Sequence, residues 1–237
     1  MSLGQGDGEG PRGRFIVVEG AEGSGKTTQA ERLRTFLREA GLRVEATREP
    51  GGTRVGERIR DLLLHDREVP IPPATELLLI LAARSAFVRE VVQPALVCGR
   101  WVVSDRFDLS TFAYQGYGRG IDPRRIEPLN RHATGGLAPD LQIVLDLPAE
   151  EGLARQKRQG KGGDRFESAG TDFHRRVRRG YVELSRTTDS AVLIPASGSV
   201  EGVAARIRSE VTSRFPEAAL GGTRAPRMRT SSAEETG

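Results

Sequence analysis

The sequence predicts an α/β fold, a five-stranded parallel sheet flanked by helices. Apolar runs of strand length recur along the chain, and segments with helical periodicity separate them. This alternation is typical of a parallel sheet that helices cover on both faces. A glycine-rich loop joins the first run to the first helical segment, as in many α/β proteins that bind anions. The five runs are FIVVE (15–19), LRVEATRE (42–49), RWVVSD (100–105), DLQIVLDL (140–147) and AVLIPA (191–196).

Length and composition are those of a globular protein with a sizeable core. The chain has 237 residues, with 37% hydrophobic and 29% charged. No apolar run approaches the ~20 residues of a membrane-spanning helix, and no N-terminal signal segment is visible, so we expect a cytoplasmic protein without membrane contact. A net charge of +4 is too small to indicate a nucleic-acid partner. The lone Cys98 excludes an internal disulfide or a multi-cysteine metal site.

The pattern predicts one domain between two tails. Residues 1–13 and 216–237 are short of core-forming side chains, so we expect both to be disordered and residues 14–215 to fold. The first helix should run over 26–40. A longer helix is expected over 74–98, with a kink at Pro94. Gly99, directly after this helix, should end it.

The segment GAEGSGKTTQ (20–29) matches the phosphate-binding pattern G-x-x-x-x-G-K-[ST] between a strand and a helix. Its glycines let backbone N–H groups approach phosphate oxygens, and the helix N-terminus attracts anions. Lys26 would neutralise the β and γ phosphates, and the Thr27 hydroxyl would bind Mg²⁺. We therefore expect ATP on the loop, held by Gly20, Ala21, Glu22, Gly23, Ser24, Gly25, Lys26, Thr27 and Thr28.

The loop identifies a phosphate donor and leaves the acceptor open. GTPases, motor ATPases and small-molecule kinases share it, and the absence of an NKxD tetrapeptide weakens the GTPase interpretation. The third predicted strand ends in Ser104-Asp105-Arg106-Phe107, at the sheet edge where α/β folds bind ligands. Asp105 could hold Mg²⁺ through a water molecule, and Arg106 could bind a second phosphate. A local surface ion pair is the alternative.

Four stretches together resemble the thymidylate kinase family, whose members phosphorylate dTMP to dTDP with ATP and Mg²⁺. The resemblance covers about residues 15–215 and implies the fold of the P-loop NTPases of nucleoside monophosphate kinase type. It also implies a role in dTTP synthesis for DNA replication and a homodimer packed through helices. The stretches are EGAEGSGKTTQ (19–29), TREPGGT (47–53), SDRFDLSTFAYQGYGRG (104–120), and PDLQIVLD (139–146) with GGDRFE (162–167).

The resemblance assigns an acceptor pocket. Arg60 and Arg106 would grip the dTMP phosphate, for which two guanidinium forks suit a dianion. Arg84 would hydrogen-bond thymine, and Glu22 would face the sugar 3′-hydroxyl. Tyr114 would crowd the sugar 2′ position and so disfavour ribonucleotides. The complete predicted set is Glu22, Glu49, Pro50, Arg60, Ile80, Arg84, Arg106, Thr111, Tyr114 and Gln115.

Ile80 departs from the family pattern. Many members have a phenylalanine there, four residues before the thymine-reading arginine, that stacks on the base. An aliphatic side chain loses the quadrupolar part of stacking, worth about 0.5–1.5 kcal/mol. A broader pyrimidine kinase acting on dUMP and dTMP therefore stays open. A non-kinase P-loop ATPase or nucleotide-binding module is a further alternative.

A basic, glycine-rich segment, RQKRQGKGGDR (155–165), predicts a mobile lid over about 155–166. Phosphoryl transfer needs positive charge on the moving phosphoryl group, and loop residues 21–24 supply none beside Lys26. By resemblance to the branch common in bacteria, the lid would supply it, although a solvated basic surface is the alternative. The predicted catalytic set is Lys26, Arg106, Arg158 and Arg165, with Arg155, Lys157 and Lys161 as further lid candidates.

Overall fold

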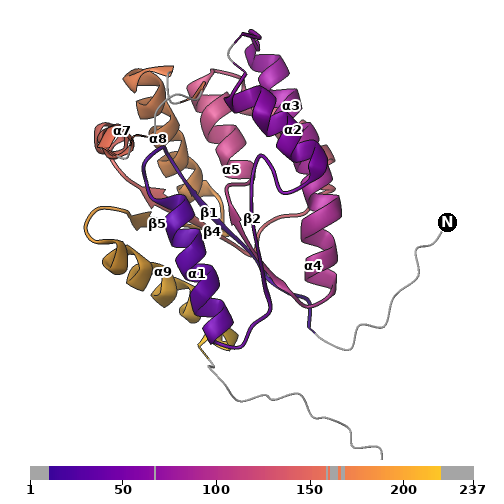
Figure 1. Cartoon of the computed structure of the whole chain (residues 1–237), viewed down its shortest axis with the longest axis vertical. Helices are drawn as coiled ribbons and strands as arrows, with labels where there is room; N and C mark the ends of the chain where they lie inside the picture. Colours follow the sequence, from indigo (N-terminus) through magenta and orange to yellow (C-terminus); the bar gives the residue numbers. More distant parts are fainter. Residues whose placement is uncertain (1–10, 67, 159, 161–164, 167–168, 220–237) are drawn as a thin grey trace, which may run out of the picture.

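The computed structural model describes residues 11–219 apart from 67, 159, 161–164 and 167–168. Its centre is a five-stranded parallel sheet with the strand order β2-β3-β1-β4-β5 (Figure 1). The predicted strands and the fold class are confirmed. The strands are β1 (Phe15–Gly20), β2 (Val44–Arg48), β3 (Trp101–Asp105), β4 (Leu141–Asp146) and β5 (Ala191–Pro195).

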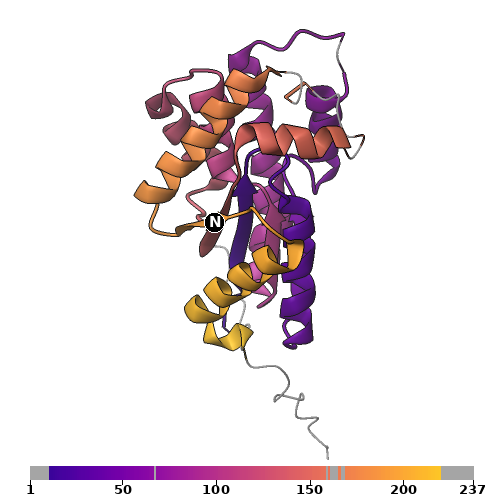
Figure 2. The ribbon, with the colours of Figure 1, turned by 90° about the vertical axis from the view of Figure 1, so that its left-hand side faces the viewer.

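Helices cover both faces of the sheet (Figures 1 and 2). On one face, Ile16 and Val18 of β1 pack with α1 (Lys26–Glu39) and α9 (Val200–Arg214). On the other face, Phe15 and Val17 pack against the segment before β3. Alternate residues of a strand face opposite sides, so a strand buried on both faces is apolar throughout. Apart from the long helix before β3, the other helices of the described residues are α2 (Arg54–Leu64), α5 (Asp108–Thr111), η2 (Phe112–Gly118), α6 (Pro123–Thr134), α7 (Ala149–Arg158), α8 (Thr171–Thr187) and the short η4 (Pro216–Ala218).

The long helix before β3 consists of three consecutive segments, α3 (Pro73–Phe87), the π-helical η1 (Val88–Val92) and α4 (Gln93–Val97). The ring of Pro94 would clash with the carbonyl four residues earlier in a regular α-helix, and the π-helical turn precedes it. The helix ends at Val97, and the predicted stop, Gly99, follows it with a φ of +64°. Neither this helix nor any other described helix is long and apolar enough to cross a membrane.

The folded domain reaches slightly into both predicted tails. The N–H of Gly13 donates to the Leu96 carbonyl at 2.9 Å, and Gly13 is buried. At the other end, η4 belongs to the domain, because Ala218 is part of the core beneath α9. The rest of the two predicted tails, 1–10 and 220–237, lies outside the described residues.

The carboxyl ends of β1, β2 and β3 lie side by side. In the strand register, Asp105 of β3 is opposite both Val18 of β1 and Arg48 of β2. The phosphate loop, the 49–53 turn and the Arg106 turn therefore leave the sheet at one edge. This edge carries the site described next.

Candidate active site

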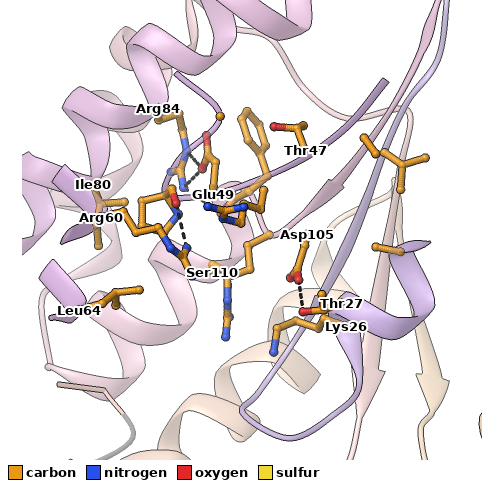
Figure 3. A pocket seen from close by; sticks show the side chains of 18 of the residues that line it. Lys26, Thr27, Thr47, Glu49, Arg60, Leu64, Ile80, Arg84, Asp105 and Ser110 are labelled. Carbon is orange, nitrogen blue, oxygen red and sulfur yellow. Dashed lines mark hydrogen bonds and ion pairs between the residues drawn. The ribbon is translucent and has the colours of Figure 1, made fainter. Parts of the chain in front are cut away.

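A cavity of about 1040 Å³ lies at this edge of the sheet (Figure 3). The phosphate loop contributes Lys26 and Thr27 to its lining, and Asp105 follows from β3. The elements around α2, α3 and η2 line the remainder. All ten predicted acceptor residues border it: Glu22, Glu49, Pro50, Arg60, Ile80, Arg84, Arg106, Thr111, Tyr114 and Gln115.

The phosphate loop has the backbone geometry that its glycines allow. Gly25 caps α1 in the left-handed conformation, with φ at +92°, and no side chain caps the helix. The N-terminus of α1 is thereby presented to an anion. The Lys26 ammonium donates to the Ala21 carbonyl at 2.9 Å, across the loop. Burial and the neighbouring Arg106 lower the pKa of Lys26, while nearby carboxylates oppose the shift.

The predicted metal ligands Thr27 and Asp105 are in direct contact. The Thr27 hydroxyl donates to Asp105 Oδ2 at 2.6 Å (Figure 3). Mg²⁺ prefers oxygen ligands, and it usually takes one or two from protein and the rest from phosphates and water. A hydroxyl and a carboxylate beside the phosphate loop fit that requirement.

Arg106 has the backbone conformation that is unusual for a side-chain-bearing residue. Its φ is +78°, and among the described residues no other non-glycine has a positive φ. Such strain persists where surrounding contacts fix it, often at functional sites. Arg106 Nη2 donates to Glu22 Oε1 at 2.5 Å and to the Tyr114 hydroxyl at 3.0 Å. The guanidinium therefore lies between the phosphate loop and the acceptor side of the cavity.

Glu22 is an ionised carboxylate inside the phosphate loop. Burial would raise the pKa of Glu22, but Arg106, Lys26 and a hydrogen bond from Tyr114 outweigh it and lower the pKa to about 2. Its second oxygen accepts from Gln156 Nε2 at 3.4 Å. An ionised carboxylate is acceptor-only, so Glu22 suits a ligand hydroxyl and repels phosphate.

Arg60 comes from α2 and reaches the same cavity. Its Nη1 donates to the Pro50 carbonyl at 2.9 Å, so the 49–53 turn positions it. Burial lowers the pKa of Arg60, and the cation Arg48 adds to the effect. Arg48 itself is exposed and pairs with Glu57 at 2.9 Å. Arg60 and Arg106 thus both line this cavity, as do Arg34, Arg48 and Arg84.

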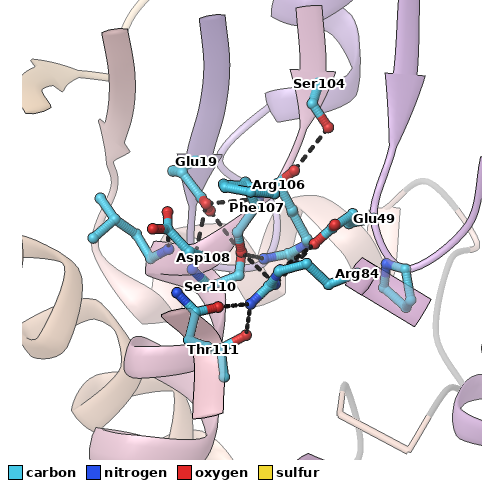
Figure 4. A network of polar contacts seen from close by, with 12 residues as sticks. Glu19, Glu49, Arg84, Ser104, Arg106, Phe107, Asp108, Ser110 and Thr111 are labelled. Carbon is cyan, nitrogen blue, oxygen red and sulfur yellow. Dashed lines mark hydrogen bonds and ion pairs between the residues drawn. The ribbon is translucent and has the colours of Figure 1, made fainter. Parts of the chain in front are cut away.

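Arg84 is a buried hub, with 1% of its surface exposed (Figure 4). Its Nη1 donates to Thr111 Oγ1 and to Asn130 Oδ1, each at 2.8 Å, and its Nη2 donates to the Phe107 carbonyl at 2.9 Å. Its Nε donates to Glu49 Oε2 at 2.9 Å. Every nitrogen of Arg84 already has a protein acceptor, so a hydrogen bond to thymine requires one of these contacts to be exchanged.

Glu49 is the buried carboxyl partner of Arg84. Burial raises the pKa of Glu49 to about 7, although the Arg84 guanidinium opposes the shift. Its Oε1 is buried without a partner among the described residues. Glu49 therefore changes charge near neutral pH beside the predicted base site.

Two of the predicted lid cations, Arg158 and Arg165, lie apart from the cavity. Arg158 is exposed at the end of α7 and is not a lining residue. Arg165 Nη2 donates to the carbonyls of Asp66 and Val69, at 2.6 and 2.7 Å, and it does not line the cavity either. The structure thus brings Lys26 and Arg106 together but not these two arginines. Lys161, another lid candidate, lies outside the described residues.

Other lid residues are part of α7. The helix continues through Arg158, because no glycine or proline interrupts it from Leu153 onward. Arg155 bonds to Glu151 at 2.6 Å and to the Ala196 carbonyl at 3.3 Å. Its contacts therefore connect α7 to the loop after β5.

Sequence reasoning missed a buried carboxylate behind the site. Glu19 accepts hydrogen bonds from the Phe107 N–H at 2.8 Å and the Ser110 hydroxyl at 2.6 Å (Figure 4). It also accepts from the Tyr181 hydroxyl at 3.0 Å. It thereby fixes the turn that carries Arg106. A carboxylate within an otherwise apolar, buried strand was the available signal. Ser110, Gln156 and Phe166 also line the cavity without having been assigned.

Comparison with known proteins identifies the family. The thymidylate kinase family model matches residues 18–207. The chain belongs to the thymidylate kinase family. A thymidylate kinase of Synechococcus sp. (strain JA-2-3B'a(2-13)) is 49% identical over 208 residues, which are 87% of this chain and 98% of the relative. One from Magnetococcus marinus is 44% identical over 86% of this chain and 98% of the relative.

The structural comparison agrees with this family. The crystal structure of thymidylate kinase from Ehrlichia chaffeensis has a TM-score of 0.70 and 30% identity, covering 85% of this chain and all of that chain. The family members phosphorylate dTMP with ATP, so this thymidylate kinase is a phosphotransferase that acts on dTMP. These comparisons give the broader pyrimidine kinase and the non-kinase module no support over it.

Proposed function

We propose that this thymidylate kinase holds ATP on the 20–28 loop and dTMP in the other half of the same cavity, and transfers the γ-phosphoryl group directly between them. The observation that carries the proposal is the shared cavity, which the phosphate loop and the complete predicted acceptor set line together. Two nucleotides that meet there would place donor phosphoryl and acceptor phosphate next to each other. Positioning of this kind supplies much of the rate enhancement of phosphoryl transfer.

Each cation has a distinct task in this proposal. Lys26 contacts the phosphates of ATP, while Arg60 and Arg106 bind the dTMP phosphate as two forks. Glu22 accepts from the 3′-hydroxyl of the sugar, an assignment supported by its ionised state. The acceptor is already a phosphate oxygen, so the reaction needs no general base.

Mg²⁺ would bind beside the loop, at Thr27 directly and at Asp105 through water. The ion would neutralise charge on the ATP phosphates. The 2.6 Å contact between the two side chains supports this assignment, because it places both oxygen atoms that would bind the ion, or its water, next to each other.

The lid supplies the remaining positive charge in this proposal. Arg158 and Arg165 lie outside the cavity, so the 155–166 segment must move for either to reach the transferred group. For Arg165, the bonds to Asp66 and Val69 would be exchanged for contacts with phosphate. Closure would also exclude water and limit ATP hydrolysis.

We further propose a homodimer and a cytoplasmic location. Exposed apolar side chains on three helices support the homodimer: Val55 of α2, Leu78 of α3 and Leu129 of α6 are 52%, 57% and 41% exposed. These helices pack against one another in that order, so one surface could bring the side chains to a partner. The cytoplasmic location stays a prediction from the sequence.

An Arg60→Ala variant tests the acceptor assignment. Loss of one charged fork should raise the KM for dTMP about 10- to 100-fold, whereas the KM for ATP should stay within about twofold. The measurement is steady-state ADP release with each substrate varied in turn. Arg58→Ala is the matched control, since Arg58 is an exposed arginine of the same helix, α2, that does not line the cavity. An unchanged KM for dTMP in the Arg60→Ala enzyme would remove Arg60 from the pocket.

A further inference from the structure

A buried carboxylate on α3 lies directly behind the predicted base site. Glu76 is 1% exposed and lies outside the cavity lining. It accepts from Gln115 Nε2 at 2.9 Å. Gln115, also 1% exposed, does line the cavity. Glu76 therefore contacts the predicted base site through Gln115.

The Glu76 carboxylate is held from its other side as well. Arg119 donates to it twice, from Nε at 3.1 Å and from Nη2 at 3.0 Å. The Arg119 guanidinium in turn lies over the rings of Phe173 and Phe166, 4.8 and 5.6 Å from their centroids. These contacts leave Glu76 little freedom to turn away from Gln115.

This arrangement fixes which end of the Gln115 amide faces a ligand. A carboxylate paired with arginine only accepts hydrogen bonds, so Gln115 must offer its NH₂ group to Glu76. A flipped amide would place its carbonyl against the carboxylate and lose the bond, at the cost of leaving buried polar atoms unpaired. Among the described residues, Glu76 is the side-chain partner of Gln115. The carbonyl oxygen is therefore the end of the amide that is left for the cavity.

We propose that Glu76 is a specificity-determining residue that acts by positioning Gln115. By orienting the amide, it requires the bound base to offer an N–H donor at ring nitrogen N3, the position that this proposal sets against the Gln115 carbonyl oxygen. Thymine and uracil have such a donor at N3, whereas N3 of cytosine is an acceptor and would face the carbonyl oxygen unpaired. The inference rests on the proposed dTMP pocket and adds the residue that sets its hydrogen-bond polarity. A purely structural role for Glu76, as an anchor for Arg119, is the competing explanation.

The test compares how three nucleotides bind to two variants. In Glu76→Gln the partner of Gln115 can donate as well as accept, and in Glu76→Met it can do neither. We expect the ratio of the Kd for dCMP to the Kd for dTMP to fall about tenfold in Glu76→Met, and by a smaller factor in Glu76→Gln. The ratio for dUMP against dTMP should change less than about twofold, because both bases have the N3 donor. Competition calorimetry with the full chain measures all three constants without requiring turnover.

A matched control is Glu90→Gln, the same change at an exposed position of the same long helix. It should leave both ratios as in the parent enzyme. If a folded Glu76→Met or Glu76→Gln variant binds all three nucleotides more weakly by the same factor, Glu76 has a structural role and the inference is overturned. Kd ratios that stay unchanged in both variants would also overturn it. If Glu76→Met does not fold, Glu76→Gln decides alone.

A Gln115→Ala variant separates the inference from the pocket assignment. If it leaves the Kd for dTMP and both ratios unchanged, the pocket assignment itself is wrong. If Gln115→Ala lowers the preference for dTMP over dCMP while the Glu76 variants do not, the pocket assignment holds and the role of Glu76 is overturned.

Discussion

Arg106 combines a strained backbone with a set of contacts that offset the strain. A positive φ costs a non-glycine residue on the order of 1–3 kcal/mol, so surrounding contacts must fix the conformation. Arg106 has them: an ion pair with Glu22, contacts with Tyr114, and a turn that Glu19 holds from behind. The consequence is a guanidinium group fixed before any substrate binds. Preorganised charge of this kind lowers the cost of binding a phosphate dianion.

Asp108, two residues after Arg106, predicts a pH dependence of stability. Burial raises the pKa of Asp108 from 3.8 to about 6, with Arg84 opposing and Glu19 adding to the shift. Between these two pH values the unfolded chain has lost a proton that the folded chain keeps. The contribution of Asp108 to the free energy of unfolding therefore falls as pH rises from 3.8 to about 6, and it is constant above that.

The measurement is urea unfolding of the parent chain and of Asp108→Asn, repeated from acid to neutral pH. The difference between their free energies of unfolding should decline over this interval, because the variant lacks the titrating group. A difference that does not vary with pH would contradict the assigned shift.

Roles could be predicted from the sequence for residues whose chemistry depends on one continuous motif. Lys26 and Thr27 could be assigned because loop, strand and helix follow one another in the chain. Glu19 and Glu76 could not, because their roles depend on partners such as Tyr181 and Arg119 that are distant in sequence. Arg84 lines the cavity, but the saturation of its donors depends on acceptors from three separate segments of the chain, at Glu49, at 107–111 and at Asn130.

At the scale of elements, the phosphate loop and α7 approach each other backbone to backbone. A Cβ added at Gly152 would lie 2.2 Å from the Glu22 carbonyl oxygen, and one added at Gly23 would lie 2.1 Å from the Gly152 carbonyl oxygen. Neither contact is possible without movement. Two glycines that face each other, Gly23 and Gly152, therefore fix the position of the start of α7, the helix that leads into the predicted lid.

A Gly152→Ala variant should push α7 away from the loop and misplace the lid. We expect kcat to fall about 10- to 100-fold while the chain stays folded, because small displacements of catalytic groups are costly. Steady-state turnover measures kcat, and circular dichroism shows whether the chain stays folded. Ala154→Ser, an exposed change on the same helix, should leave kcat unaltered. A Gly152→Ala enzyme with the parent kcat would show that this close approach has no catalytic importance.

Elements were predicted best where apolar runs define them. All five strands were found, since buried parallel strands are apolar along their whole length. The π-helical segment η1 was not, because its apolar pattern continues that of α3 without interruption. The contact of Arg165 with the loop before α3 was also unpredictable, since the sequence gives no sign that the two segments meet.

At the scale of the whole molecule, the proposed homodimer makes a direct prediction. Replacing Leu78, a 57% exposed leucine on α3, by glutamate should bury a charge in the interface and give a monomer. Sedimentation equilibrium measures the mass. Val97→Glu, at an exposed position on α4, is the control that should remain dimeric. A parent chain that sediments as a monomer would contradict the proposal.

The central claim is that one cavity brings ATP and dTMP together for direct transfer. Its most direct test is ADP release with ATP and Mg²⁺, measured with dTMP, with dUMP, with dCMP and without an acceptor. We expect rapid release with dTMP, slower release with dUMP and dCMP, and almost none without an acceptor. Release at the same rate with and without dTMP would contradict the claim, because the cavity would then support hydrolysis of ATP instead of transfer to the bound nucleotide.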